Sequence, residues 1–319
     1  MSNDMYHNLI RNRWIKYSIQ IIILSFCVLF IIHNVRQINL QIVDMDILKL
    51  IWSLIFIMVG GILGAISWWL SLRIFDFKVN ILNVSKIQFK SNLVKYIPGY
   101  AWQLLGKGIL TANQGIPKEI IGVIIIFEYI LIIISGASLA GLIFPIEFVS
   151  KFSPFQIPLK FVIYLRLGSL VVLFVIPLFF NKLFKMLPKL YAINKFDIRK
   201  SYFLIILMII TWIINSVGFD FLIQALSKTN ISIVPIIFTL TTIFIVGLLI
   251  VIIPGSLGIR ESLIILMLGP TLGNNIAGLV AIVFRMITIL SELLLFVIII
   301  LWSHKLRIKV NNNPKVLLP

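Results

Sequence analysis

Runs of apolar residues, each about 20 positions long, recur along almost the whole chain and alternate with short polar segments. A helix needs about 20 such residues to cross a hydrocarbon core about 30 Å thick, so each run predicts a transmembrane helix. The predicted spans are approximately 15–32, 47–70, 118–144, 159–180, 201–226, 232–253 and 276–301. The pattern therefore predicts an all-α, polytopic membrane protein with about seven to eight spans.

Two further segments are interrupted by a proline followed by a glycine. Residues 85–110 form an amphipathic stretch with four lysines that Pro98-Gly99 breaks, and residues 255–269 are too short to span and directly follow Pro254. A broken helix leaves backbone groups unpaired, which lipid tolerates only where the break is buried in protein or lines a watery cavity. Both segments are therefore predicted to be re-entrant or discontinuous helices.

The composition excludes most soluble functions. Hydrophobic residues make up 60% of the 319 positions and charged residues only 12%, too few to cover a soluble globule of this size. The net charge of +17 is compatible with nucleic acid, but the cations lie in short loops between apolar runs, which instead favours contact with anionic lipid headgroups. Cys27 is the one cysteine and the three histidines are scattered, so we expect no disulfide, metal or cofactor. We expect a single transmembrane domain over 1–319 and no nucleic-acid binding.

The distribution of lysine and arginine predicts the orientation in a plasma or inner cell membrane. The cation-rich segments are predicted to be cytoplasmic: the N-terminal arm, 73–95, the linker 181–200 and the tail 302–319. The loops 33–46 and 145–157 carry few cations and are predicted to lie outside. The first span has a basic flank and no small-residue cleavage site, which indicates an uncleaved signal anchor. Both termini are then cytoplasmic, and 232–274 must cross an even number of times, as a hairpin or as two spans.

The same constraint predicts an internal repeat. Residues 47–144 and 201–301 each contain a span, a Pro-Gly break and a second span, and the first unit starts outside while the second starts inside. Pro98 precedes Glu128 by 30 residues, and Pro254 precedes Arg285 by 31. Inverted repeats with broken helices that meet near the midplane are a common transporter plan. The alternative is that any bundle of apolar helices looks self-similar.

Three ionisable residues lie inside predicted spans, where burial costs several kcal/mol unless a partner is present. Glu128 lies in VIIIFEYILIII, Arg285 lies in AIVFRMITIL, and Glu292 follows Arg285 by seven residues on the same helical face. These residues are expected to face the interior of the bundle. They either fix helix register as structural ion pairs or take part in a functional site, and their place near the two breaks favours the second reading.

The second break, PGSLGIRESL, is the most specific stretch in the chain. Gly255 and Gly258 allow the backbone to turn close to a ligand, and Ser256 can cap the short helix that follows. Arg260 and Glu261 then fall in its first turn. An arginine beside a helix N-terminus suits a phosphate or another anion, and Glu261 can hold Arg260 or act as a charge partner.

The first break has a looser set of candidate residues. Cations and amphipathic side chains surround Pro98-Gly99 at the depth expected for lipid headgroups: Lys95, Tyr96, Trp102, Gln103 and Lys107. For the aromatic side chains the alternative is the ordinary aromatic belt of a membrane protein. The sequence therefore predicts two half-sites for lipid, one at each break.

The segments KYIPGYAWQLLGKGIL and IIPGSLGIRESLIIL, each followed by a span with an ionisable residue, resemble the transmembrane region of lysylphosphatidylglycerol synthases, also called the flippase-like domain. The resemblance covers roughly 15–301. It implies handling or translocation of lipid, with anionic or polyprenyl-phosphate lipids as cargo, and the first motif resembles stand-alone members associated with surface-polysaccharide assembly. One departure is that many members have Glu-Arg in the third span, where this chain has Glu128-Tyr129.

The resemblance does not imply synthase activity, because only about eighteen residues follow the last predicted span and the soluble aminoacyl-transfer domain is absent. No nucleophile and base can be paired, so we expect no enzyme. The leading hypothesis is a lipid flippase or transporter-like protein that contacts membrane lipids. The alternative is a non-transporting scaffold or accessory subunit for glycosyltransferases or other envelope enzymes.

Overall fold

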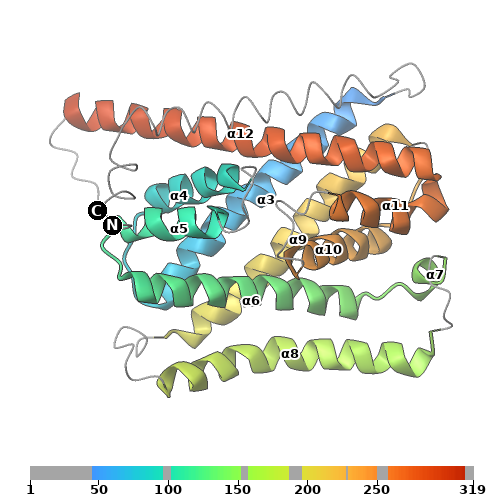
Figure 1. Cartoon of the computed structure of the whole chain (residues 1–319), viewed down its shortest axis with the longest axis horizontal. Coiled ribbons are helices and arrows are strands. Elements are labelled where there is room, and N and C mark those ends of the chain that lie inside the picture. Colours follow the sequence, from blue (N-terminus) through green and yellow to red (C-terminus); the bar gives the residue numbers. More distant parts are fainter. Residues whose placement is uncertain are drawn as a thin grey trace, which may run out of the picture.

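The computed structural model describes residues 45–95, 102–151, 157–186, 196–227, 229–249 and 258–312. Every regular element in these ranges is an α-helix, which confirms the predicted all-α fold (Figure 1). Five helices are long and apolar enough to cross a membrane, and a sixth apolar helix is shorter. The chain is therefore a polytopic helical membrane protein. The predicted first span, 15–32, lies outside these ranges.

The long helices match the predicted spans closely. They are α3 (Ile47–Ile74), α6 (Lys118–Leu142), α8 (Leu159–Lys185), α9 (Ile198–Leu226) and α12 (Asn274–Asn312), with the shorter α10 at Ile233–Leu249. The main difference is that α12 continues 11 residues beyond the predicted end at 301. This extension reaches into the basic tail, where lysine and arginine are good helix formers and favour continuation of the helix.

Four short helices complete the described fold: α4 (Ile81–Val94), α5 (Trp102–Ala112), α7 (Ile146–Val149) and α11 (Ile259–Leu272). At 1.5 Å per residue, α4 and α5 are about 21 and 17 Å long, so neither crosses a bilayer alone. The helix α4 packs against α5, and α10 packs against α11 (Figure 1). Residues 96–101 and 250–257, which contain both Pro-Gly pairs, lie outside the described ranges, so the re-entrant character of these segments stays a prediction.

The helices α3 to α6 and the helices α9 to α12 pack by the same scheme, and we call these two groups the first half and the second half. The first helices of the two halves, α3 and α9, pack against each other. The last helix of each half contacts the first two helices of the opposite half: α12 contacts α3 and α4, and α6 contacts α9 and α10. Exchanging the halves therefore reproduces the pattern of helix contacts, as an inverted repeat would; the repeat itself stays a prediction.

The contact between α3 and α9 depends on small residues. A Cβ atom added to Gly60 would overlap the side chain of Asn215, and one added to Gly218 would lie 3.1 Å from the Ser53 carbonyl oxygen. Such close approach of backbones is typical of membrane helices with small residues at the interface. Gly64, the second glycine of the GxxxG sequence, has no atom within 4 Å of an added Cβ, so only Gly60 of this pair packs closely.

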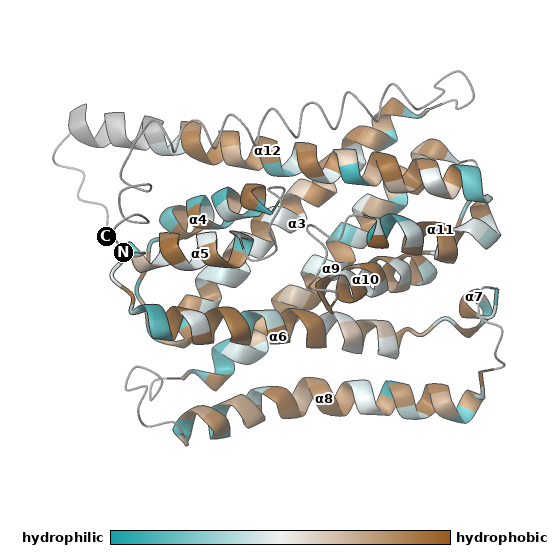
Figure 2. Cartoon of the chain, viewed as in Figure 1, coloured by the Kyte–Doolittle hydropathy of each residue, from teal (hydrophilic) through white to brown (hydrophobic). Residues whose placement is uncertain are grey.

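Hydrophobic side chains form two large core clusters, one toward each end of the bundle. One gathers around Phe75 and Phe127, and the other around Phe219 and Leu268. Apolar residues predominate along the long helices, and α12 also carries hydrophilic residues partway along its length (Figure 2). At one end the α3 terminus meets the α9 start, where the Asp197 N–H donates to the Ile74 carbonyl at 3.0 Å.

Candidate functional site

A small cavity of about 70 Å³ lies where the end of α4 meets α10, α11 and α12. It is lined by Lys95, Phe244, Arg260, Glu261, Ile264, Ala281, Phe284, Arg285, Thr288 and Glu292. Lys95 immediately precedes the first break, and Arg260 closely follows the second. The cavity therefore brings the flanks of both breaks together, although they are more than 150 residues apart in the sequence. We call it the central cavity.

Lys95 reaches the central cavity from the first half. It is the C-cap residue of α4 and forms an ion pair with Glu292 on α12. The helix α4 is held beside α12 by a hydrophobic cluster in which Phe89 packs with Leu295 and Ile299. The ion pair is partly buried, with 25% and 17% of the two side chains exposed. Lys95 and Glu292 therefore link the two halves at the wall of the cavity.

The start of α11 holds Glu261 in place. Gly258 caps this helix with φ +83°, a conformation that side-chain-bearing residues rarely adopt, and its N–H donates to the Glu261 carboxylate at 2.9 Å. The prediction that Ser256 caps this helix is wrong, because α11 begins at Ile259 and its N-cap is Gly258. The same carboxylate also forms an ion pair with Arg285 on α12. Glu261 thus acts as the charge partner of Arg285.

Arg260 lies beside this pair and against an aromatic ring. Its guanidinium carbon lies 4.2 Å from the centre of the Phe244 ring on α10, within the range of a cation–π contact. Phe284 lies 6.2 Å from Phe244, so the two rings and Ile264 give the cavity an apolar wall. The cavity therefore combines cations with apolar surface, as an amphipathic ligand requires.

Two other ionisable residues of the first half form a separate cluster. Lys107 on α5 forms an ion pair with Glu128 on α6, and the two side chains are only 5% and 3% exposed. The Lys107 ammonium also lies 3.9 Å from the centre of the Trp68 ring on α3. Lys107 was expected at headgroup depth near the first break, but it is buried inside the protein. Lys107 is thus the cationic partner of Glu128.

Of the remaining predicted site residues, Gln103 has a described side chain, and it joins neither cluster. The side-chain amide of Gln103 donates to Asn92 on α4 at 3.1 Å and thereby ties α5 to α4. The following predicted residues lie outside the described ranges: Tyr96, Pro98, Gly99, Pro254, Gly255 and Ser256. Only the backbone of Trp102 is described. The site that the structure defines is therefore formed by charged residues on the helices that flank the breaks.

Sequence reasoning missed the aromatic partners of these cations. Trp68 lies in α3 and Phe244 in α10, and both are surrounded in the sequence by other apolar residues. Thr288, which lines the central cavity, was missed for the same reason. Nothing in the hydropathy pattern separates an aromatic residue under a cation from one that faces lipid. Their identification requires the packing of distant helices.

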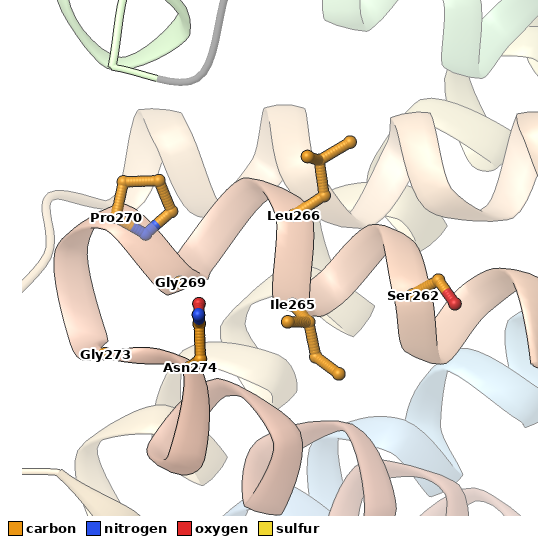
Figure 3. A pocket seen from close by; sticks show the side chains of 7 residues that line it. All are labelled: Ser262, Ile265, Leu266, Gly269, Pro270, Gly273 and Asn274. Carbon is orange, nitrogen blue, oxygen red and sulfur yellow. The ribbon is translucent and has the colours of Figure 1, made fainter.

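A second hollow is larger but lacks charge. Figure 3 shows this hollow, about 780 Å³, beside the turn at Gly273 that connects α11 and α12. Its lining contains no charged side chain: Ser262, Ile265, Leu266, Gly269, Pro270, Gly273 and Asn274. An anionic headgroup would meet no cation here. Of these two spaces, the central cavity is therefore the one suited to an anion.

The central cavity has a formal excess of positive charge, since three cations and two carboxylates line it.

Comparison with known families gives an independent result. The family described as the Lysylphosphatidylglycerol synthase TM region matches residues 17–296. No curated protein and no solved structure matches the chain.

Proposed function

Because the chain belongs to the family of the lysylphosphatidylglycerol synthase transmembrane region, we propose that it moves a lipid with a phosphate-bearing headgroup between the two leaflets of the membrane. The lipid is an anionic phospholipid or a polyprenyl-phosphate-linked glycolipid used in envelope or surface-polysaccharide assembly. The observation that carries this proposal is the central cavity, in which Lys95 of the first half meets Arg260 and Arg285 of the second half.

The chemistry of the cavity suits a phosphate. Arginine binds phosphate through paired N–H donors, and the N-terminus of α11 adds backbone N–H groups that favour negative charge. Glu261 and Glu292 hold two of the cations when no lipid is present, which avoids the cost of an isolated charge inside the membrane. The aromatic wall at Phe244 offers apolar surface to the glycerol and the first part of the acyl chains.

The position of the cavity suits translocation. It lies at the junction of two halves that pack by the same scheme, and transporters with inverted repeats commonly place their substrate site at this junction. A lipid headgroup at such a place exchanges sides when the halves move relative to one another, while its acyl chains remain in the bilayer. Membrane lipids are then the partners of the protein.

The proposal is tested by a flip assay in proteoliposomes. Phosphatidylglycerol with a fluorescent acyl chain is reconstituted with the protein, and dithionite bleaches only the label in the outer leaflet. We expect the double variant Arg260→Ala plus Arg285→Ala to lower the flip rate at least tenfold, about 1.4 kcal/mol of barrier. Arg199→Ala is the matched control, since Arg199 is an exposed arginine at the start of α9, away from the cavity.

Two outcomes are informative about the alternative. Equal flip rates for the wild-type protein and the double variant count against lipid transport through this cavity. Stable co-purification with an envelope glycosyltransferase, with no flip activity, favours the scaffold function instead. A parallel experiment with labelled phosphatidylcholine and labelled polyprenyl phosphate identifies the headgroup, because the cations select for net negative charge rather than for phosphate alone.

A further inference from the structure

The two halves each contain an ion pair between the helix after the break and the last helix, with the charges exchanged. In the first half the cation lies on the short helix, as Lys107 on α5 pairs with Glu128 on α6. In the second half the cation lies on the long helix, as Arg285 on α12 pairs with Glu261 on α11. Both pairs connect equivalent elements of the packing scheme.

The surroundings of the two pairs differ. The α12 face at the central cavity consists of five residues: Ala281, Phe284, Arg285, Thr288 and Glu292. The α6 residues 157 positions earlier form the equivalent face: Ile124, Phe127, Glu128, Leu131 and Ser135. Every residue of this α6 face is at most 2% exposed, whereas its counterpart on α12 borders a cavity. The structure therefore has one face open and the equivalent face closed.

The α6 face is closed by residues from several helices. Lys107 pairs with Glu128, and the Trp68 ring lies against the Lys107 ammonium. Phe180 of α8 lies edge-on against Phe127 with 5.0 Å between ring centres. Farther along α6, the Trp212 indole N–H of α9 donates to the Ser135 hydroxyl at 3.2 Å. Polar and charged groups thus lie on a face whose residues are almost fully buried in this state.

We propose that this α6 face is a second position for the phosphate headgroup, which opens when the central cavity closes. The inference rests on the proposed function. Because the halves pack equivalently, each half can take the arrangement that the other has here, as in transporters that alternate between repeats. In the exchanged state Lys107 is released from Glu128 to bind the phosphate beside Trp68, while Arg285 and Glu261 become enclosed.

The ion pairs explain how both faces remain stable when empty. A lone lysine or glutamate enclosed in the membrane costs far more than a pair, so each cation needs a carboxylate whenever its face is closed. Glu128 serves Lys107 in this state, and Glu261 serves Arg285. The headgroup phosphate replaces the carboxylate as partner of the cation only when lipid occupies the open face.

Cysteine accessibility tests the opening of the α6 face. In a Cys27→Ser background, Ser135→Cys is compared with Ser216→Cys, since both serines are fully buried and Ser216 lies on α9, outside the α6 face. The two variants are placed in vesicles with labelled phosphatidylglycerol, and a small water-soluble thiol reagent is added. We expect the cysteine at 135 to react at least tenfold faster than the cysteine at 216.

The flip assay on the same vesicles separates the possible failures. If lipid flips at the wild-type rate and the cysteine at 135 is as unreactive as that at 216, the α6 face does not open and this inference is wrong. If neither the wild-type protein nor any variant flips a labelled lipid, the proposed function fails and this inference fails with it. Faster reaction at 135, together with lipid flipping by the Cys27→Ser parent protein, supports both.

A second variant separates transport from structure. Lys107→Met plus Glu128→Gln removes both charges and keeps similar volumes, and neutral replacement of a buried ion pair is often harmless or stabilising. We expect this variant to unfold at the same temperature as the wild-type protein or higher, but to flip phosphatidylglycerol at least tenfold more slowly. An unchanged flip rate would show that the pair has only a structural role.

Discussion

Lys95 at the end of α4 forms an ion pair with Glu292 on α12, and so connects the first half of the protein to the second at the wall of the central cavity. The two residues are 197 positions apart in the sequence. The contact depends on α4 lying across α12, which the Phe89 cluster maintains. At the wall of the central cavity, this ion pair transmits a movement of one half directly to the other.

We therefore expect Glu292→Gln to lower the flip rate about tenfold, because Lys95 loses this carboxylate and the cavity wall loses its link, a cost of about 1.4 kcal/mol. The exchanged variant, Lys95→Glu plus Glu292→Lys, should recover most of the rate. Lys49→Ala is the control, since the Asp46–Lys49 pair is well exposed and such pairs contribute little. An exchanged variant no faster than Glu292→Gln would show that the link itself is unimportant.

The crossing of α3 and α9 gives a prediction about stability. Gly60→Ala should destabilise the protein by about 1–3 kcal/mol, because the new methyl group overlaps Asn215, whose amide is already held by the Thr211 carbonyl at 2.8 Å. Adding Asn215→Ala should restore most of the loss. Gly64→Ala, four residues along the same helix with open space around it, should be neutral or slightly stabilising. Thermal unfolding in detergent measures all three.

The turn at the start of α11 allows a matched comparison of two glycines. Gly258 and Gly115 have φ of +83° and +82°, so alanine at either position introduces about 1–2 kcal/mol of backbone strain. Only Gly258 holds Glu261 against Arg285. We expect both variants to unfold at lower temperature and only Gly258→Ala to slow flipping per folded molecule. A similar slowing by Gly115→Ala would mean that strain alone accounts for the effect.

The N-terminus of α9 gives a prediction about pH. Partial burial by itself raises the pKa of Asp197, but hydrogen bonds from the Lys200 side chain and from the Arg199 and Lys200 amides, with the Lys200 charge, outweigh it and lower this pKa below its usual value. A carboxylate with a lowered pKa stabilises the folded state above its unfolded pKa, near 4, and this stabilisation is lost as the pH falls through the folded pKa.

Asp197→Ala should therefore cost about 0.5–2 kcal/mol at neutral pH and progressively less below about pH 4. Asp197→Asn is the control, because asparagine is also a good N-cap but does not titrate. Its difference in unfolding temperature from the wild-type protein should disappear in acid. If the difference in unfolding temperature between the wild-type protein and Asp197→Asn stays constant from pH 7 to pH 3, the carboxylate does not have this role.

The hydropathy pattern predicted most of the fold because membrane helices are defined by local composition. The helix α6 begins at Lys118 as expected, and α8 begins at Leu159. The helix boundaries that differ from the predicted ones depend on single residues near the helix ends. The helix α9 starts three residues before the predicted 201 because Asp197 caps it. The helix α12 runs past 301 because residues 302–310 contain no proline or glycine, and it ends at Asn312, two residues before Pro314.

The candidate site was only partly predictable for a different reason. The cost of a charge in lipid is visible in the sequence, so Glu128, Arg285 and Glu292 could be singled out before any partner was known. Which cation meets which carboxylate depends on tertiary packing between distant helices. Arg285 and Glu292 share a helical face, yet each pairs with a residue of another helix.

The length of α12 means that a small tilt of this helix at the central cavity becomes a larger displacement at its C-terminal end. The helix has 39 residues, and about 40 Å of it extends beyond Arg285 toward its C-terminal end at Asn312. A tilt of about 5° at the cavity would displace that end by roughly 3–4 Å, because displacement grows in proportion to distance along the helix. A spin label or dye attached near Asn312 would thus report, as a larger displacement, a movement of α12 that is small at the central cavity.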